Sequence, residues 1–452
     1  MNSAISDAIR ISSRWLQYQA YTKEIPGLAF GVFQKEAPPQ YFFIGEADVA
    51  SNKEVTSQTL FRIASISKLF TTVAVLQLVQ KQKISLQDSL GKRLPWLASN
   101  QQVADLRIET LLSHLSGLSR EASTQDYWNN DGFPTFKELK KYAQTTPCVL
   151  SPNQTFKYSN FAFGLLGQII ESITQTSYEE YVQKNIFEVL SLTNTHVDIT
   201  KEAPTLATGY ARKFPEEKRA SFSAASTKAL ASATGFASTL KDVSTFMHSL
   251  MIQDPRLLSE EMHKEMRRIR WSGEENLLLG LGYQAWNVDN KEIFGHSGAF
   301  PGFSTATAFD AELGVGISIL TNVIDMCAID FLQSVYSILY HCLDNYQEYA
   351  NSSLSNPQEY IGRFTSRWSE NYVAVVNKTP LIYNPSLKRP LSKSTRIKKD
   401  SSNKAVTEGG SGFGILGEEV SLLKEEGVVT KMKIGSFLTH KKAYLGSTIR
   451  NE

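Results

Sequence analysis

Residues 61–70 read FRIASISKLF and hold a serine and a lysine three positions apart. Positions i and i+3 of a helix share a face, so a helix beginning near Ser65 places the Lys68 amine beside the serine hydroxyl. Apolar residues then recur at three- and four-residue steps, as such a helix requires: Leu69, Val73, Leu76 and Val79. A serine hydroxyl needs a neighbouring base to take its proton, and burial leaves part of a lysine neutral. The stretch therefore predicts a nucleophile, Ser65, and its general base, Lys68.

The Ser-x-x-Lys spacing is not specific by itself, because the chain contains four further copies of it. These are Ser89/Lys92, Ser238/Lys241, Ser401/Lys404 and Ser421/Lys424. They lie in polar or turn-like surroundings, where an exposed serine and lysine are ordinary. Ser65 has apolar flanks and a long apolar-periodic segment behind it, so we favour this copy.

The composition is that of an ordinary globular protein with room for two domains in 452 residues. A net charge of +2 gives no argument for nucleic-acid or membrane binding. No apolar run approaches the roughly 18 residues of a membrane span, and the first residues do not resemble a secretory leader. The three cysteines have no metal-binding spacing, which favours reduced thiols in a cytoplasmic protein without a metal or cofactor: Cys148, Cys327 and Cys342.

Hydrophobic periodicity predicts an α+β fold for the first part of the chain. Strands are expected at 28–34, 41–44, 277–286, 292–294, 303–309 and 313–320. Helices are expected at 3–20, 106–118, 136–144, 161–174, 178–187 and 326–344. The segment 235–250 has a Ser/Thr cap before Lys241 and Asp242, followed by an amphipathic helix. We therefore expect an antiparallel sheet flanked by helices, together with an all-helical region.

The pattern changes to short strands with turns after residue 360. Strands are expected at 372–376, 381–383, 420–423, 428–434 and 443–445. We place one domain at 1–345, a linker at 346–358 and a second, small domain at 359–452. A G-x-G-x-x-G match at 412–417 leads into a strand-like segment rather than a helix, so we reject a dinucleotide site there.

Six motifs together resemble the serine β-lactamase and penicillin-binding-protein-like hydrolases, in the class C-like branch of esterases and D-amino-acid peptidases. In chain order they are RIASISK (62–68), LLSHLSGL (111–118), YSNFAFGLLG (158–167), GFASTLKD (235–242), LGLGY (279–283) and GHSGAFPGF (295–303). The YIGRF segment at 360–364 and the segment near 412–419 resemble the small lipocalin-like β-barrel often attached to these hydrolases. The resemblance implies a β-lactamase/transpeptidase-like domain followed by that barrel.

The resemblance also implies roles for individual residues. Ser65 matches the acylated nucleophile, Lys68 its base, and Tyr158 the proton shuttle to the leaving group. Asn160 matches the residue that bonds the substrate amide and the lysine. The third motif, on the strand that edges the site, is matched by His296, Ser297 and Gly298, and the backbone N–H groups of Ser65 and Ala299 match the oxyanion hole.

The third motif departs from the Lys-Thr-Gly of lactam-handling members. Histidine is a poorer fixed cation than lysine at pH 7, so His296 favours the esterase and peptidase branch. A purely structural His296 stays an alternative, and a hydrogen-bonded structural role is expected for His114. No acidic residue stands out as a separate deacylation base.

The sequence thus predicts a serine hydrolase that cleaves a small-molecule ester, amide or peptide through an acyl-enzyme on Ser65. Two alternatives remain: β-lactamase or penicillin-binding activity proper, and a non-hydrolytic sensor or scaffold. Neither the substrate nor the oligomeric state follows from the sequence.

Overall fold

The computed structural model describes residues 3–122, 126–128, 132–199, 203, 205–215, 217–273, 277–325, 327–351, 354–410 and 415–451. Contacts between residues divide the chain into two compact units. One comprises Pro26–Ile329 with Asn451–Glu452, and the other comprises Met1–Ile25 with Asp330–Arg450. Among the described residues, no helix combines the length and the apolar character that a membrane span requires.

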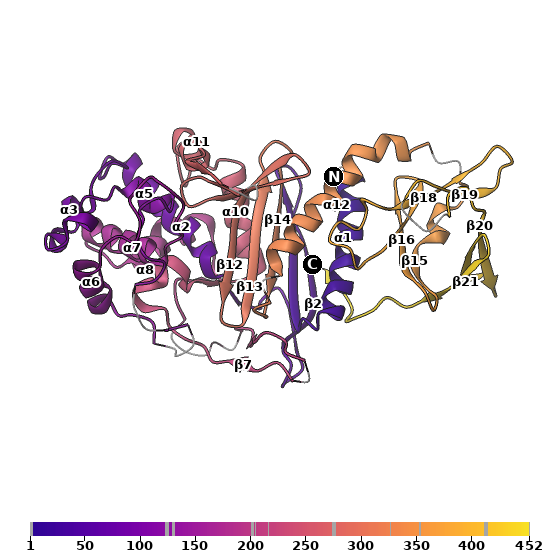
Figure 1. Ribbon diagram of the computed structural model, residues 1–452, viewed down its shortest axis with the longest axis horizontal. Helices are drawn as coiled ribbons and strands as arrows, with labels where there is room; N and C mark the ends of the chain where they lie inside the picture. The colour runs from indigo at the N-terminus through magenta and orange to yellow at the C-terminus, as the bar shows by residue number, and fades with distance from the viewer. Residues whose placement is uncertain are drawn as a thin grey trace. The chain divides into compact units, whose positions relative to one another are not determined.

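The larger unit contains an antiparallel sheet with strand order β2-β1-β14-β13-β12-β11-β10-β9. Its strands are β1 (Gly27–Gln34), β2 (Gln40–Asp48), β9 (Trp271–Ser272), β10 (Leu277–Leu279), β11 (Gln284–Val288), β12 (Lys291–Phe300), β13 (Phe303–Asp310) and β14 (Val315–Thr321), with β3 (Lys53–Glu54) paired to β2. Every residue of β1, β13 and β14 is buried, as expected when both faces of a sheet are covered. The helix α10 (Leu240–Met251) packs against these three strands (Figure 1).

A helical region completes this unit around α2 (Ser67–Gln80), which is buried from Ser67 to Leu78. A helix that is apolar on all sides belongs in a core, and α7 (Asn160–Thr174) packs beside it. The other elements are α3 (Leu90–Arg93), α4 (Gln101–Ala104), α5 (Ile108–Leu112), α6 (Phe136–Thr145), α8 (Tyr178–Val182), α9 (Glu188–Leu190), α11 (Glu260–Arg267) and η5 (Ala231–Gly235). Three short strands form a small separate sheet: β4 (Phe61–Arg62), β5 (Thr195–His196) and β8 (Ala237–Ser238).

Three predicted elements differ in the structure. The helix expected at 106–118 ends at Leu112, and His114 follows it with a φ of 57°. The strand expected at 277–286 is two strands, because Gly282 turns the chain with a φ of 70°. The strand expected at 292–294 continues to Phe300, since pairing with β13 holds it extended through the glycines of the third motif.

The smaller unit contains an eight-stranded antiparallel sheet with strand order β19-β18-β17-β16-β15-β22-β21-β20. The strands are β15 (Gly362–Thr365), β16 (Glu370–Val376), β17 (Thr379–Tyr383), β18 (Thr395–Lys399), β19 (Ala405–Glu408), β20 (Val420–Glu425), β21 (Val428–Ile434) and β22 (Phe437–Lys442). A bridge between Val406 and Glu419 joins its two ends, so the sheet is a nearly closed up-and-down barrel. The predicted fold class, an α+β hydrolase domain followed by a small all-β barrel, is therefore confirmed.

The strand expected at 443–445 is wrong: the chain is extended one segment earlier, in β22, where it pairs with β15 and β21. Three barrel strands were not anticipated, β15, β18 and β19. Residues 412–414 of the rejected G-x-G-x-x-G match lie outside the described residues, and β20 follows the match as a strand.

The grouping by contacts differs from the predicted domain boundaries. The first helix, α1 (Ser3–Thr22), belongs to the smaller unit, where the Trp15 ring lies 5.7 Å from the Phe331 ring and Trp15 Nε1 donates to Leu387 O at 3.1 Å. The helix α12 (Ala328–Tyr349) also runs into the predicted linker. Both helices bond to the barrel, since Asp7 of α1 accepts from Asn377 N at 2.8 Å and Tyr349 O of α12 accepts from Thr379 Oγ1 at 2.8 Å, so both ends of the chain contribute to this unit.

Candidate active site

Ser65 lies between a strand and a helix. It is the central residue of a single 3-10 turn, η1 (Ala64–Ile66), which joins β4 to α2. Ala64 has a φ of 50°, and Ser67 Oγ stabilises the turn by donating to Ala64 O at 2.5 Å and accepting from Phe236 N at 3.1 Å. Ser65, which the sequence predicted at the start of a helix, therefore lies on a sharp turn two residues before the first residue of α2. Its side chain is half-buried.

Lys68 points back from the first turn of α2 to Ser65. Its Nζ lies 3.2 Å from Ser65 Oγ, 2.8 Å from Asn160 Oδ1 and 2.7 Å from Ala233 O. The last two oxygens can only accept hydrogen bonds. When the amine is protonated, its third N–H donates to Ser65 Oγ. When it is neutral, its two N–H groups go to the other two oxygens and its lone pair faces the serine hydroxyl.

The surroundings of Lys68 favour this neutral form. The side chain is fully buried. Burial lowers the pKa of Lys68 well below its usual value, the nearby Glu121 carboxylate raises it, and the Arg120 guanidinium lowers it. Burial is the largest of these influences, so the net effect favours the neutral amine that a base must be.

Tyr158 approaches Ser65 from the segment that precedes α7. Its hydroxyl donates to Ser65 Oγ at 2.7 Å. Loss of solvation raises the pKa of Tyr158 well above its usual value, so the phenol keeps its proton at neutral pH. The Lys68 amine also lies over the tyrosine ring, 4.8 Å from its centroid.

Asn160, the first residue of α7, connects Lys68 to an acidic residue. Its Oδ1 accepts from Lys68, and its Nδ2 donates to the two Glu121 carboxylate oxygens at 3.0 and 3.1 Å. Ser159 caps α7 through a bond from Ala162 N to its Oγ at 2.9 Å, and this cap fixes the position of Asn160. The sequence-predicted residues Ser65, Lys68, Tyr158 and Asn160 therefore form one connected set.

The third motif lies on β12, which packs directly against the turn that carries Ser65. Gly298 leaves no space for a Cβ, which would lie 2.5 Å from Ile63 O and in contact with Thr305 Oγ1. Ala299, next along the strand, is half-buried. The Gln284 side chain accepts from Ser297 N at 3.1 Å and from Ser297 Oγ at 3.0 Å, so the β11-facing edge of β12 is closed just before Gly298.

His296 is buried and uncharged. Its Nδ1 lies 2.5 Å from Ser297 O and must donate to it, which leaves Nε2 as an unprotonated nitrogen with no partner among the described residues. Burial is the main cause that lowers the pKa of His296 to about 3, and Lys68 lowers it further when its amine is protonated. His296 therefore provides no cation at neutral pH, unlike a lysine at this position.

His114 supports Tyr158 rather than joining the proton-transfer set. Its Nδ1 accepts from Ser159 N at 3.1 Å, and its ring stacks on the Tyr158 ring with centroids 4.4 Å apart. Burial lowers the pKa of His114 well below its usual value. This geometry agrees with the structural role expected from the sequence.

The arrangement can carry out acyl transfer: a serine hydroxyl contacts a buried amine and a protonated phenol, beside the strand that carries the third motif. A family model described as Beta-lactamase matches residues 14–324, which include all of these groups. The chain belongs to the Beta-lactamase family. It is a serine hydrolase of that family.

Known relatives agree with this assignment. A protein of Yersinia enterocolitica named Beta-lactamase is 28% identical over 285 residues, which cover 61% of this chain and 69% of the relative. The D-amino acid amidase of Ochrobactrum anthropi, solved with D-phenylalanine, superposes with a TM-score of 0.64 at 22% identity over 75% of this chain and 99% of its own. The octameric penicillin-binding protein homologue of Pyrococcus abyssi has a TM-score of 0.65 at 17% identity and covers 95% of this chain and 99% of its own. The two structures establish the shared fold.

Sequence reasoning missed two groups of this β-lactamase-family site. The Ala233 carbonyl oxygen, which accepts a hydrogen bond from Lys68, lies in η5. A backbone acceptor of this kind cannot be predicted from a pattern of side chains. Glu121 lies in a loop between α5 and α6, and its role arises only from tertiary contacts. Its position just after the LLSHLSGL motif was the only signal in the sequence.

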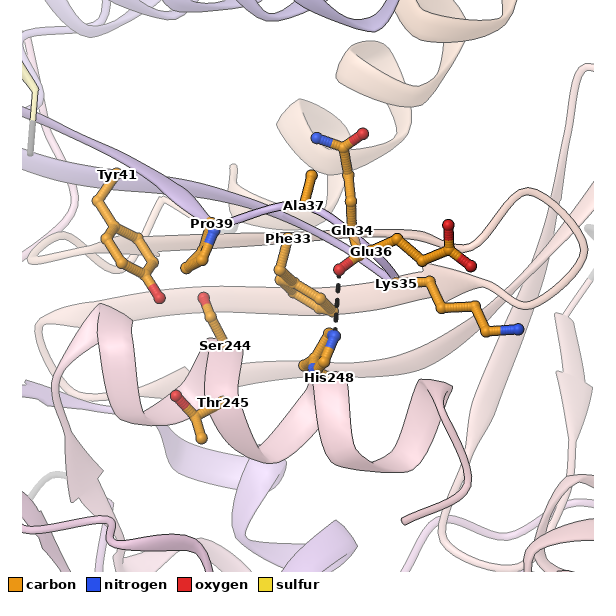
Figure 2. Close-up of a pocket in the computed structure, with 10 residues that line it drawn as sticks. All are labelled: Phe33, Gln34, Lys35, Glu36, Ala37, Pro39, Tyr41, Ser244, Thr245 and His248. Atoms are coloured by element: carbon orange, nitrogen blue, oxygen red, sulfur yellow. Dashed lines mark hydrogen bonds between the residues drawn. The ribbon is translucent and has the colours of Figure 1, made fainter. Parts of the chain in front are cut away.

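A separate cavity of about 270 Å³ lies between the β1–β2 hairpin and α10 (Figure 2). It is lined by Phe33, Tyr41 and Ser244 among others, and His248 Nε2 lies 3.1 Å from Gln34 O at its edge. In Figure 2 the charged side chains nearby extend away from Ser244. This cavity contains none of the residues that surround Ser65 and brings no base to its serine.

Proposed function

We propose that Ser65 is the nucleophile of this hydrolase and is acylated and deacylated in each cycle. The distribution of the Lys68 hydrogen bonds carries this proposal. Asn160 Oδ1 and Ala233 O accept from two N–H groups of the amine, so the neutral amine directs its lone pair at the hydroxyl 3.2 Å away. A scaffold without chemistry has no need for a buried neutral lysine held in this way.

Acylation begins when Ser65 Oγ attacks the substrate carbonyl carbon and its proton passes to Lys68 Nζ. The negative charge that develops on the carbonyl oxygen is accepted by the backbone N–H groups of Ser65 and Ala299. Removal of one such donor costs about 2.7–4 kcal/mol in other hydrolases. The bond to the leaving group then breaks, and Tyr158 gives its proton to the departing oxygen or nitrogen while Lys68 returns a proton to the tyrosine.

Deacylation follows the same route with water in place of the leaving group. Water loses a proton to the Tyr158–Lys68 pair as its oxygen attacks the acyl carbon, and the bond to Ser65 Oγ breaks as that oxygen regains a proton. No separate acidic base is required, because the same two groups accept and return the proton.

The neutral His296 bears on the choice of substrate. Members that process β-lactams carry a lysine at the corresponding position, whereas this chain presents a buried imidazole whose pKa is about 3. We therefore propose small-molecule esters or peptide-type amides as substrates, and poor turnover of carboxylate-bearing lactams. Asn160 and the Gly298–Ala299 edge of β12 would hold the acyl group.

The test compares the wild type with Ser65→Ala on a short-chain nitrophenyl ester and on a chromogenic cephalosporin. Ser249→Ala is a matched control, because this serine is also buried and its hydroxyl donates only within a helix, to Phe246 O at 2.6 Å. Ester turnover that is lost in Ser65→Ala and retained in Ser249→Ala is the expected result.

Other outcomes are equally informative. Ester turnover that persists in Ser65→Ala would overturn the assignment of the nucleophile. Cephalosporin turnover comparable to ester turnover would show that the protein acts as a β-lactamase. It would also overturn the proposal that an uncharged His296 makes lactams poor substrates. A mass increase on Ser65 that persists for hours, without turnover, would identify an acylated sensor.

A cytoplasmic location is part of the same proposal. Its support is the presence of the free thiols Cys148 and Cys342, which are typical of a reducing compartment. Fractionation of the producing cells, with activity measured in each fraction, tests it.

A further inference from the structure

The Glu121 carboxylate gathers four donors beside the catalytic set. It accepts from Asn160 Nδ2 at 3.0 and 3.1 Å, from Trp128 Nε1 at 3.1 Å and from the Tyr127 hydroxyl. The Arg120 Nε lies 3.1 Å away as an ion-pair partner. The carboxylate is only 20% exposed, so its position is determined by these contacts rather than by water.

The bonds of Glu121 decide which way the Asn160 amide faces. A carboxylate can only accept hydrogen bonds, so Asn160 must direct its NH2 group toward Glu121. Its carbonyl oxygen then faces the other way and accepts from Lys68 at 2.8 Å. A reversed amide would offer the lysine a donor in place of an acceptor.

We propose that Glu121 is a positioning residue that keeps the Lys68 lone pair directed at Ser65 by fixing the orientation of the Asn160 amide. The chain of contacts runs from Glu121 to Asn160, from Asn160 to Lys68, and from Lys68 to Ser65. The inference rests on the proposed function, because it assumes that Lys68 acts as the base.

Replacement of Glu121 by glutamine alters this chain in two ways. A glutamine side chain has one accepting oxygen, whereas the carboxylate has two. If that oxygen accepts from Trp128 and Tyr127, the glutamine NH2 group faces Asn160, and the Asn160 amide must reverse to accept from it. Lys68 turns its lone pair toward the reversed amide and away from Ser65. The change also removes a negative charge, and that charge raises the pKa of Lys68.

The experiment measures kcat/KM for the nitrophenyl ester against pH in the wild type, Glu121→Gln and Glu121→Asp. The activity should rise with pH as Lys68 loses its proton. In Glu121→Gln we expect two changes in this profile. The plateau of kcat/KM at high pH should fall about 10- to 100-fold. The rising limb should move to lower pH by about 1 unit, because a lysine ammonium without a nearby carboxylate is more acidic. Glu121→Asp keeps the charge, so its limb should stay at the wild-type pH.

Glu109→Gln is the matched control. Its carboxylate is 27% exposed and pairs with Arg270 Nε at 2.8 Å, and it contacts none of Ser65, Lys68 and Asn160. This variant should keep both the plateau and the limb of the wild type.

A purely structural role would lower the plateau in both Glu121 variants while the limb stays in place, and this result would overturn the inference. So would wild-type behaviour of Glu121→Gln. These outcomes are distinct from failure of the proposed function, which appears as ester turnover by Ser65→Ala. Thermal unfolding of each variant verifies that it is folded.

Discussion

The Tyr158 hydroxyl donates a 2.7 Å hydrogen bond to Ser65 Oγ, although 93 residues separate the two in the sequence. The serine oxygen thus has a proton donor on one side and the Lys68 amine on the other, 3.2 Å away. The two partners differ in protonation because burial acts on them in opposite ways. It raises the pKa of the phenol, which favours the protonated phenol, and it lowers the pKa of the amine, which favours the neutral amine.

Tyr158→Phe removes the proton donor and keeps the ring that stacks on His114. We expect kcat/KM for the ester to fall by about 10²- to 10⁴-fold, with little change in thermal stability. Tyr178→Phe is the control, because the Tyr178 hydroxyl bonds to Thr71 Oγ1 at 2.6 Å and burial also raises its pKa. Equal losses in the two variants would show that the effect comes from packing rather than from proton transfer.

Much of this site followed from short motifs because its chemistry depends on side chains at fixed local spacing. The pairing of Ser65 with Lys68 could be predicted from the geometry of a single helical turn. The position of Asn160 could be predicted from the expected start of α7. The path of β12 beyond residue 294 could not be predicted, because glycines weaken strand propensity and only pairing with β13 holds that segment extended. The role of Glu121 was equally hidden, since its bonds are made across the fold.

Local sequence patterns also could not predict that the first helix belongs to the same unit as the barrel. The α1 pattern predicted a helix correctly, but an amphipathic helix does not reveal which core receives its apolar face. Contacts such as Trp15 with Phe331 place it in the smaller unit. The barrel strands were only partly anticipated, because a short strand such as β15 offers too few residues for a clear alternation.

Gly298→Ala should reduce activity more than stability. The new Cβ would lie 2.5 Å from Ile63 O, a backbone atom that cannot rotate away, so β12 must move from the turn that presents Ser65. A displacement near 1 Å costs on the order of 10²-fold in rate. Gly31→Ala, on β1 of the same sheet, is the control: its Cβ would meet only side-chain atoms, at 3.1 Å and beyond. Similar ester activities in the two variants would contradict the prediction.

Acid should destabilise the protein through His296. The pKa of this histidine is about 3 in the folded protein, chiefly because of burial, and about 6.5 in an unfolded chain. Between these values the unfolded chain binds a proton that the folded protein does not, so stability falls as the pH falls. From pH 7 to pH 5 we expect this group alone to cost about 2 kcal/mol.

Urea unfolding at pH 7 and pH 5 measures this cost. Between pH 7 and pH 5, His296→Gln should lose less stability than the wild type. His440→Gln, at an exposed position, is the control and should lose as much stability as the wild type. Identical losses in the wild type and His296→Gln would show that the imidazole is solvated.

Arg62→Leu should destabilise the larger unit strongly. The Arg62 side chain is 1% exposed and donates to Asp198 Oδ1 at 3.1 Å, to Gly235 O at 2.6 Å and to Ile199 O at 2.9 Å. Leucine fills part of the volume but leaves these acceptors unpaired in a dry interior, which costs about 3–5 kcal/mol.

Arg256→Leu provides the comparison for this loss. Arg256 also pairs with an aspartate, Asp254 Oδ2 at 2.6 Å, but it is 63% exposed, so its loss should cost less than about 1 kcal/mol. Urea unfolding of both variants at pH 7 measures the difference. Because Arg62 lies on β4, directly before the turn that carries Ser65, folded Arg62→Leu should also lose ester activity. Full activity per folded molecule would mean that the turn is held by Ser67 and β12 without the arginine.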